Sequence, residues 1–424
     1  MERITLTFGF SLPPKGKEGM AVTIVEAPAG ITGGVDTHLD THVAAALDPL
    51  GRLVGTEHFE ANTAGYQALV TWLEDFGQVT KIGVEGTGSY GVGLARFLRR
   101  RRIEVVEVNR PNRQSRRHQG KSDPLDAVEA ARAAISGRAS GAGKTKDGPV
   151  EAIRVLVVAK RSARQARVKA ITQMRHLVYT ALEQLHRRLK GLSVPALVAE
   201  GAKLRPGRSA DPLTAATKAS LSSLARRIQA LDEEIAQLDE KIESLLVATA
   251  PELLGLFGVG PDTAAALLVA AGDNPGRLHS EAAWAHLCGV SPIPADSGKT
   301  TGHLRHHQGG DRQANSALWR IVMVRIAHDP ETTHYFERRV KEGRTKQDVI
   351  RILKRYVARE VYRYLPRGRI PGTWVCLAPD MSPSGVDFPV NRRPTSRDHF
   401  PKTRDFVRAC PRIPSGSSLF CPLS

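Results

Sequence analysis

The sequence is short of cysteine, of aromatic residues and of long apolar runs, and each shortage excludes a class of protein. Its four cysteines are widely spaced and form no CxxC pair, which argues against a disulfide scaffold or zinc ribbon and fits a reducing cytoplasm. Aromatic residues make up 5% of the chain, so a base-stacking platform for single strands is not indicated. No stretch approaches the roughly 18 apolar residues that span a bilayer. Residues 1–30 also lack the apolar region and cleavage site of a secretory signal, so we expect a cytoplasmic protein without a membrane partner.

Positive charge, in contrast, is abundant. The 424 residues include 61 Lys and Arg against 43 Asp and Glu, a formal net charge of +18. Because 41% of the residues are hydrophobic, the chain can build real cores and is not a disordered polybasic protein. The charge therefore favours a polyanionic partner, either nucleic acid or an acidic membrane surface. At about 150 residues per domain, the length suggests two or three domains.

The first domain, residues 31–140, has the pattern of an α/β RNase H-like (RuvC-like) fold. It follows residues 1–30, which read as a leader with Met20 as an alternative start. Three short strands joined by hairpins precede a helix, a strand, a second helix and a fifth strand, predicted at 31–38, 41–48, 52–60, 62–76, 79–86, 90–101 and 103–109. This order is typical of RNase H-like domains, although other α/β proteins can imitate it.

The rest of the chain reads as mainly helical. Residues 141–250 combine a Gly-, Ser- and Lys-rich linker with a basic helix over 150–190 and a second helix near 217–248. In the second helix, leucines and isoleucines recur with alternating spacings of three and four, at Leu221, Leu224, Ile228, Leu231, Ile235, Leu238, Ile242 and Leu245. This heptad seam predicts a coiled coil. The alternative is a hairpin with the 150–190 helix of the same chain, because a seam does not identify the chain that supplies its partner.

A compact all-α domain is expected over 251–365. The tail, residues 366–424, holds 10 of the 26 prolines and reads as mostly disordered.

Four acids stand out in the first domain. Asp36 and Glu85 end apolar strands, and Asp123 and Asp126 lie three residues apart at the start of a helix. In an RNase H-like sheet the first and fourth strands are neighbours, so these carboxylates are expected to converge. Carboxylates with phosphate oxygens and water are typical Mg²⁺ ligands, and paired ions promote phosphodiester cleavage. We therefore predict a Mg²⁺ (or Mn²⁺) site at Asp36, Glu85, Asp123 and Asp126.

Each acid also has an ordinary structural interpretation. Asp123 before Pro124 suits a helix N-cap, Asp126 suits the helix dipole, and Asp36 suits a turn. The alternating His38, Asp40 and His42 suggest a transition-metal site, but we interpret them as strand or turn residues. It is the combination of four acids in this fold order that favours a metal site.

A basic stretch lies between two of these acids. Its residues from Arg96 to Lys121 carry a local net charge of +8, which is too one-sided for an ordinary solvated helix face and predicts contacts with a phosphate backbone. The predicted nucleic-acid contacts here are Arg99, Arg100, Arg101, Arg102, Arg110, Arg113, Arg116, Arg117 and Lys121.

The C-terminal domain offers a further constellation. Gly258-Val259-Gly260 resembles the turn of a helix-hairpin-helix, whose N–H groups hold phosphate, although a purely structural αα-hairpin is equally compatible. Downstream, Ser297 lies in a Ser-Gly loop beside Lys299, and Arg305 and Arg312 follow as further predicted nucleic-acid contacts. Composition alone makes Ser297 an ordinary loop serine. His303, His306 and His307 lack the cysteine partners and spacing of a zinc site.

Several of these motifs, in this order, resemble the IS110-family (IS110/IS1111-type) insertion-sequence transposases. The resemblance covers about residues 30–365 and rests on GVDTH, GVEGTGSYG, KSDPLDA, GVGPDTA, CGVSPIPADSGKT, GGDRQAN and LKRYVAREVYRYL. It implies an N-terminal RuvC-like DEDD domain, a coiled-coil region and a C-terminal transposase domain. The family's acids correspond to Asp36, Glu85, Asp123 and Asp126, and its nucleophilic serine to Ser297. Many members have a second serine where this chain has Asp296, and Ser291 is a weaker alternative nucleophile.

The resemblance also implies partners. Family members use a structured non-coding guide RNA (a bridge RNA) to choose donor and target DNA, and they act as dimers or tetramers that the heptad seam would assemble. This leads to an RNA-guided DNA recombinase, cytoplasmic and associated with the bacterial nucleoid. Two other hypotheses stay open: a junction-resolving nuclease that uses water, and a non-catalytic nucleic-acid-binding remnant. The sequence does not give the guide RNA sequence, the target site, the oligomer size, the role of the tail or whether this copy is active.

Overall fold

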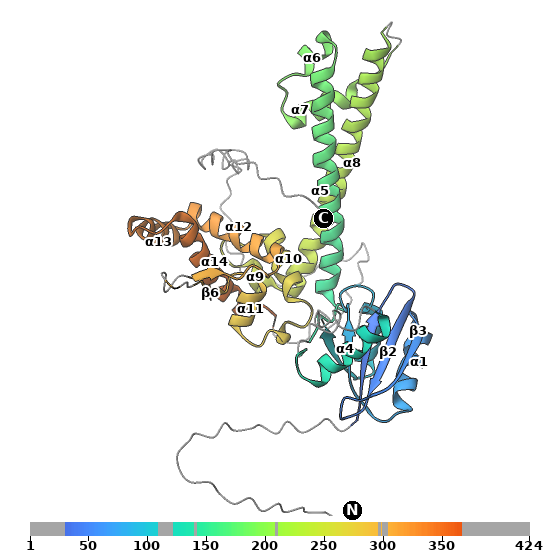
Figure 1. Cartoon of the computed structure of the whole chain (residues 1–424). Helices are drawn as coiled ribbons and strands as arrows, with labels where there is room; N and C mark the ends of the chain where they lie inside the picture. Colours follow the sequence, from blue (N-terminus) through green and yellow to red (C-terminus); the bar gives the residue numbers. More distant parts are fainter. Residues whose placement is uncertain are drawn as a thin grey trace, which may run out of the picture. The chain divides into compact units, whose positions relative to one another are not determined.

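The computed structural model describes residues 30–108, 122–139, 142–207, 211–295, 298 and 304–366 (Figure 1). The expected leader and the proline-rich tail therefore lie outside the described residues. None of the described helices is both long enough and apolar enough to cross a membrane.

A five-stranded mixed sheet forms the N-terminal domain. Its strands are β1 (Ile31–Thr37), β2 (Thr41–Leu47), β3 (Leu53–Glu60), β4 (Val79–Glu85) and β5 (Glu104–Val108), in the spatial order β3-β2-β1-β4-β5. The first three strands pair antiparallel, whereas β1 with β4 and β4 with β5 are parallel. The first and fourth strands are thus neighbours, as the RNase H-like order requires.

Helices cover both faces of this sheet because its strands alternate between two apolar surfaces. In β2, Ala44 and Ala46 pack with α1 (Thr63–Glu74) and α2 (Val92–Arg100). Val43, Ala45 and Leu47 of the same strand pack against α4 (Asp123–Ile135) on the opposite face. The domain therefore has three layers, and α4 alone among these helices covers its side of the sheet.

Glycine allows α4 to approach the sheet closely. A Cβ atom added at Gly34 of β1 would lie 2.1 Å from the Ala127 carbonyl oxygen of α4, and one at Gly83 of β4 would lie 2.4 Å from that of Ala130. Real Cβ atoms essentially never make contacts this short. The two glycines thus let α4 lie on the backbone of β1 and β4, with its acidic first turn near the strand ends.

Two long helices follow, α5 (Pro149–Thr180) and α8 (Pro212–Thr249), with α6 (Glu183–Leu189) and α7 (Val194–Lys203) between them in the chain. Of the heptad seam, Leu221, Ile228 and Ile242 are fully buried, and α8 packs extensively against α5 of the same chain. The intramolecular hairpin is thus the arrangement seen. The basic helix predicted over 150–190 ends earlier than expected, because Ala181 is extended.

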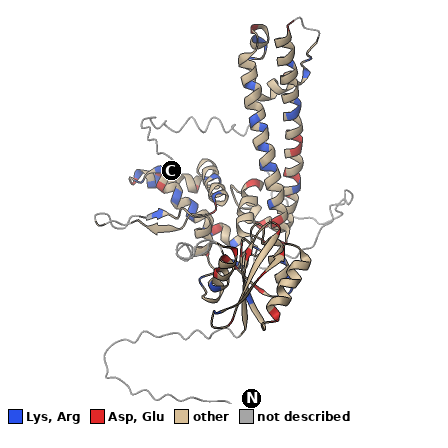
Figure 2. Ribbon diagram, turned by 45° about the vertical axis from the view of Figure 1, so that its right-hand side comes forward, with Lys and Arg blue, Asp and Glu red and all other residues tan. Residues whose placement is uncertain are grey.

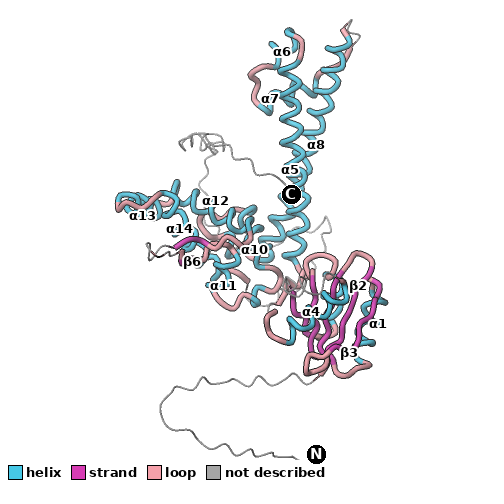
Figure 3. Tube along the Cα trace, in the orientation of Figure 1, coloured by secondary structure: helices cyan, strands magenta, loops and turns pink. Residues whose placement is uncertain are grey.

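The C-terminal part is largely helical, with α9 (Pro251–Leu254), α10 (Pro261–Ala271), the 3₁₀ turn η1 (Pro275–Arg277), α11 (Glu281–Leu287), α12 (Arg312–His328), α13 (Pro330–Lys341) and α14 (Lys346–Tyr364). Its core surrounds the fully buried Trp284. The expectation of an all-α domain is wrong in one respect: β6 (Pro292–Pro294) and β7 (Leu304–His306) form a hairpin (Figure 3). Each strand has only three residues, and β6 contains two prolines, so neither carries a recognisable strand pattern.

Candidate metal centre

Asp36 and Glu85 lie at adjacent strand ends. In the parallel register of β1 and β4, Val35 is opposite Val84, so the next residue of each strand is one of the two acids. The Thr37 hydroxyl donates a hydrogen bond of 2.8 Å to the Glu85 carbonyl oxygen and ties the strand ends together. Asp36 is buried, with 8% of its surface exposed, and Glu85 is half-buried.

The first turn of α4 adds the other two predicted acids. Asp123 is its first residue, and Asp126 is almost completely buried. Burial raises the pKa of the Asp36 carboxyl, and the negative charges of Asp126 and Asp123 raise it further, whereas His38 opposes the shift. Asp123 and Asp126 are therefore close enough to influence Asp36 electrostatically.

His38 completes the most compact part of the cluster. Its Nε2 atom lies 3.2 Å from Asp36 Oδ2 and 3.4 Å from Asp123 Oδ2. One ligand atom from each of the three residues falls within 4.8 Å of the others, a spacing that suits a metal ion. The sequence suggests a metal role for His38 through its alternation with Asp36, but our interpretation from the sequence is a strand or turn residue. Its contact with Asp123 of α4 favours the metal interpretation.

The neighbouring polar residues do not join this cluster. His42 is fully buried and stacks on Tyr66. Burial lowers the pKa of its imidazole. Asp40 is exposed in the turn between β1 and β2. Their interpretation as strand and turn residues fits the structure. Glu85 and Asp126 flank the compact trio of Asp36, His38 and Asp123 without belonging to it.

Part of the predicted basic surface is described. Arg100, Arg101 and Arg102 are exposed at the end of α2, and Arg305 and Arg312 are exposed in the C-terminal part. Arg99 is half-buried instead and donates to the Thr145 carbonyl oxygen at 3.5 Å, while burial lowers its pKa. Arg110, Arg113, Arg116, Arg117, Lys121 and Lys299 lie outside the described residues. Figure 2 shows further Lys and Arg residues along the long helices and the C-terminal helices.

Ser297 and Asp296 also lie outside the described residues, between β6 and β7. The base of that hairpin is well defined: the His307 amide donates to the Ser291 carbonyl oxygen at 3.0 Å. Behind it, the buried Lys354 Nζ donates to Asn315 Oδ1 at 2.6 Å. Burial and the nearby charges of Lys354 and Arg351 lower the pKa of His306 to about 4. The described residues thus define the base of the β6–β7 hairpin, on either side of the segment that contains Ser297.

The Gly258–Gly260 turn favours the structural alternative. Gly258 has φ +79°, and the Gly260 amide donates to Thr263 Oγ1 at 2.9 Å, so this N–H is satisfied internally. Asp262 in the first turn of α10 pairs with Lys160 and Arg164 of α5. The helix start therefore carries a paired carboxylate where a phosphate would bind.

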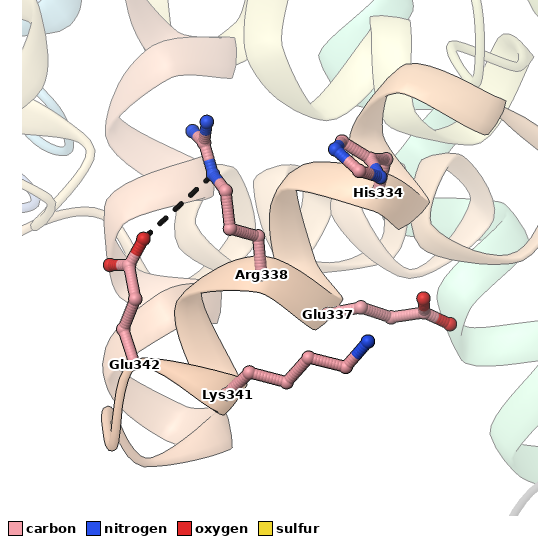
Figure 4. A pocket seen from close by; sticks show the side chains of 5 residues that line it. All are labelled: His334, Glu337, Arg338, Lys341 and Glu342. Carbon is pink, nitrogen blue, oxygen red and sulfur yellow. Dashed lines mark ion pairs between the residues drawn. The ribbon is translucent and has the colours of Figure 1, made fainter.

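A pocket on α13 holds no comparable grouping. Figure 4 shows its lining residues, His334, Glu337, Arg338, Lys341 and Glu342, which come from α13 and the residue after it. Arg338 and Glu342 pair there at 3.9 Å. A mixture of both signs on one helix surface is typical of a solvated helix face.

Comparison with known proteins agrees with the motifs. A family model described as a transposase, of the IS110 DEDD type, matches residues 33–183, and a second, described as "Transposase IS116/IS110/IS902 family", matches residues 250–337. The first match contains the metal-centre residues. The second contains Ser297.

Two similar proteins come from bacterial insertion elements. The 42 kDa protein of insertion element IS900 from Mycobacterium paratuberculosis is 30% identical over 137 residues. The 43.6 kDa protein of insertion element IS110 from Streptomyces coelicolor is 32% identical over 140 residues. Each alignment covers 32% of this chain and 34% of the relative, so about a third of each relative's length is matched. With both domain models matching in sequence order, the chain belongs to the IS110 family of insertion-element transposases.

Proposed function

We propose that this protein is a DNA transposase that cleaves and rejoins strands at the ends of its insertion element and at a target. The observation that carries the proposal is that Asp36, at the C-terminal end of β1, lies close to Asp123 and Asp126 in the first turn of α4. Acids that repel one another at a buried position destabilise the fold unless a cation compensates them. Such a cost is typical of a functional site.

The oxygen donors fit a divalent metal ion. Asp36, Glu85, Asp123 and Asp126 would hold Mg²⁺ or Mn²⁺, which would supply charge for binding and activating the scissile phosphate. Without the ion, the acids repel phosphate. The Thr37–Glu85 hydrogen bond and the burial of Asp126 hold two of these residues in place before any ion binds.

Ser297 is the proposed nucleophile. Its Oγ would attack the scissile phosphorus, and the bond from phosphorus to the leaving deoxyribose oxygen would break as that oxygen takes a proton. The enzyme would then carry DNA through a phosphoserine ester, and attack by another strand's hydroxyl would release the serine. This role rests on the family resemblance and on the position of Ser297 within the matched C-terminal domain.

The proposed partners are the element ends, the target DNA and a structured guide RNA. The net charge of +18 and the exposed Arg100, Arg101 and Arg102 support binding of nucleic-acid backbones. Charge does not distinguish RNA from DNA, so the guide RNA is inferred from the resemblance. We also propose a cytoplasmic, nucleoid-associated dimer or tetramer. The heptad seam of α8 already packs on α5 of the same chain. Contacts between subunits would therefore use the half-buried central seam positions, Leu231, Ile235 and Leu238, or other surfaces.

The decisive experiment uses the full-length protein, the DNA flanking its gene and RNA transcribed from that DNA. Covalent protein–DNA adducts are resolved on a denaturing gel in Mg²⁺ or Mn²⁺. We expect adducts with the wild type and with Ser291→Ala, and none with Ser297→Ala. Asp36→Asn should abolish cleavage, whereas Asp40→Asn, at an exposed position outside the cluster, should not.

Two outcomes would favour the alternatives. Cleavage that leaves protein-free ends and persists in Ser297→Ala indicates a junction nuclease that uses water. DNA binding without cleavage under any of these conditions indicates a non-catalytic remnant. Full cleavage by Asp36→Asn in the presence of a chelator would overturn the role of the metal.

A further inference from the structure

His38 occupies a fixed position between two of the proposed metal ligands. It follows β1 directly, and its backbone N–H donates to the Thr41 carbonyl oxygen at 3.1 Å across the turn into β2. Two residues after Asp36, it lies on the same face of the strand. The imidazole is thus directed by the backbone toward the side where α4 places Asp123.

The distances around Nε2 are those of ligands that share an ion. Two ligands at right angles on an ion with bonds of about 2.1 Å lie roughly 3 Å apart. Nε2 lies 3.2 Å from an Asp36 oxygen and 3.4 Å from an Asp123 oxygen. A single ion between them would therefore contact all three residues with little rearrangement.

The hydrogen bonding of Nε2 helps to distinguish a metal ligand from an ordinary ion-pair partner. The atom is inaccessible to solvent, yet it makes no hydrogen bond of acceptable geometry in the structure. Although two carboxylate oxygens lie 3.2 and 3.4 Å away, neither is placed to accept a hydrogen bond from this nitrogen. A buried, unsatisfied nitrogen is costly, and a bound cation would satisfy it through its lone pair.

We infer that His38 is a nitrogen ligand of the proposed metal ion and that it makes the centre prefer a divalent transition metal, such as Mn²⁺, over Mg²⁺. The inference rests on the proposed metal-dependent function. Mg²⁺ binds oxygen ligands almost exclusively, whereas imidazole suits Fe, Ni, Cu and Zn ions. Mn²⁺ favours oxygen ligands as well, but as a transition-metal ion it accepts a nitrogen ligand more readily than Mg²⁺ does. One imidazole with two or more carboxylates is a mixed donor set that Mn²⁺ accepts and Mg²⁺ does not favour.

The test is electron paramagnetic resonance of the full-length protein with Mn²⁺ as the probe. In the wild type, pulsed measurements should detect ¹⁴N coupling to bound Mn²⁺. His38→Ala should remove the coupling and weaken Mn²⁺ binding by about 10-fold or more. His58→Ala, at an exposed position of the edge strand β3, is the matched control and should retain both.

Competition measures the preference. Displacing Mn²⁺ from the wild type should require more Mg²⁺ than displacing it from His38→Asp, which offers oxygen ligands only. Mn²⁺ bound to the wild type without ¹⁴N coupling, or coupling that survives in His38→Ala, would overturn the inference and leave the metal centre standing. Mn²⁺ binding that is absent in the wild type would overturn both the inference and the proposed metal centre.

Discussion

Replacing Gly34 with alanine tests how the metal centre is assembled. The added methyl group would lie 2.1 Å from the Ala127 carbonyl oxygen, 2.3 Å from the Ala131 nitrogen and 2.6 Å from the Ala131 Cβ. Ordinary contacts start near 3.4 Å, so α4 would have to move from β1 by about 1 Å. Because two of the three contacts are backbone atoms of a helix, no side-chain rotation relieves the overlap.

The cost should fall at the upper end of the range for overpacking, about 3 kcal/mol. For a domain of roughly 100 residues, this lowers the melting temperature by about 12 °C or more. The same movement carries Asp123 and Asp126 away from Asp36, so Mn²⁺ affinity should fall together with stability. A purely destabilising mutation elsewhere would not change Mn²⁺ affinity at a temperature where the protein is folded.

Thermal unfolding followed by circular dichroism, with Mn²⁺ titration at 15 °C, measures both effects. Gly276→Ala is the matched control, because a Cβ at Gly276 meets no atom within 4 Å. It should leave both quantities unchanged. Wild-type melting temperature and Mn²⁺ affinity in Gly34→Ala would refute the close packing of α4 on β1 and its role in placing the acids.

Three further substitutions test other parts of the fold by thermal unfolding. Lys160→Met removes a buried ammonium that pairs with two carboxylates, and it should destabilise the protein by about 2 kcal/mol. Arg161→Met, at an exposed position on the same helix, should cost less than about 0.5 kcal/mol. Equal effects of the two substitutions would contradict the pairing. Asp273→Ala removes the carboxylate that accepts the first amides of α5 and should cost about 1–2 kcal/mol, with Asp273→Asn milder; an unchanged melting temperature would exclude this cap. His306 has a pKa lowered to about 4, so the unfolded state takes up its proton first, and stability should be lost as pH falls from 6.5 toward 4. His306→Gln should flatten that loss, and a slope equal to the wild type's would rule out His306 as its source.

The sequence predicted the strands and their order because each element has a local pattern. Alternating apolar residues and the turns between them define β1 to β3, and the position of Asp36 and Glu85 at strand ends follows from those elements. That Asp36 and Asp123 approach each other follows from the fold order once it is recognised. These inferences need only periodicity and the topology of RNase H-like sheets.

Other features depend on contacts that no local pattern encodes. Asp273 caps α5 from more than 120 residues away in the chain, at a helix whose own N-cap position is a glycine without a side-chain acceptor. The heptad seam of α8 predicted a helical partner but did not identify α5. His38 looked like one of three alternating turn residues, and only the docking of α4 distinguishes it from His42.

The parts of the proposed metal centre are held by contacts of different strength, and this difference indicates what a bound ion would do. Asp36 and Glu85 are fixed by the β1–β4 register and by the Thr37 hydrogen bond. Asp123 and Asp126 depend on helix packing over Gly34 and Gly83, while their charges raise the pKa of Asp36 and oppose that packing. Stability and the proposed function therefore conflict at the contact between α4 and the sheet. Because a cation would remove this repulsion, metal binding should stabilise the docking of α4 as well as bind phosphate.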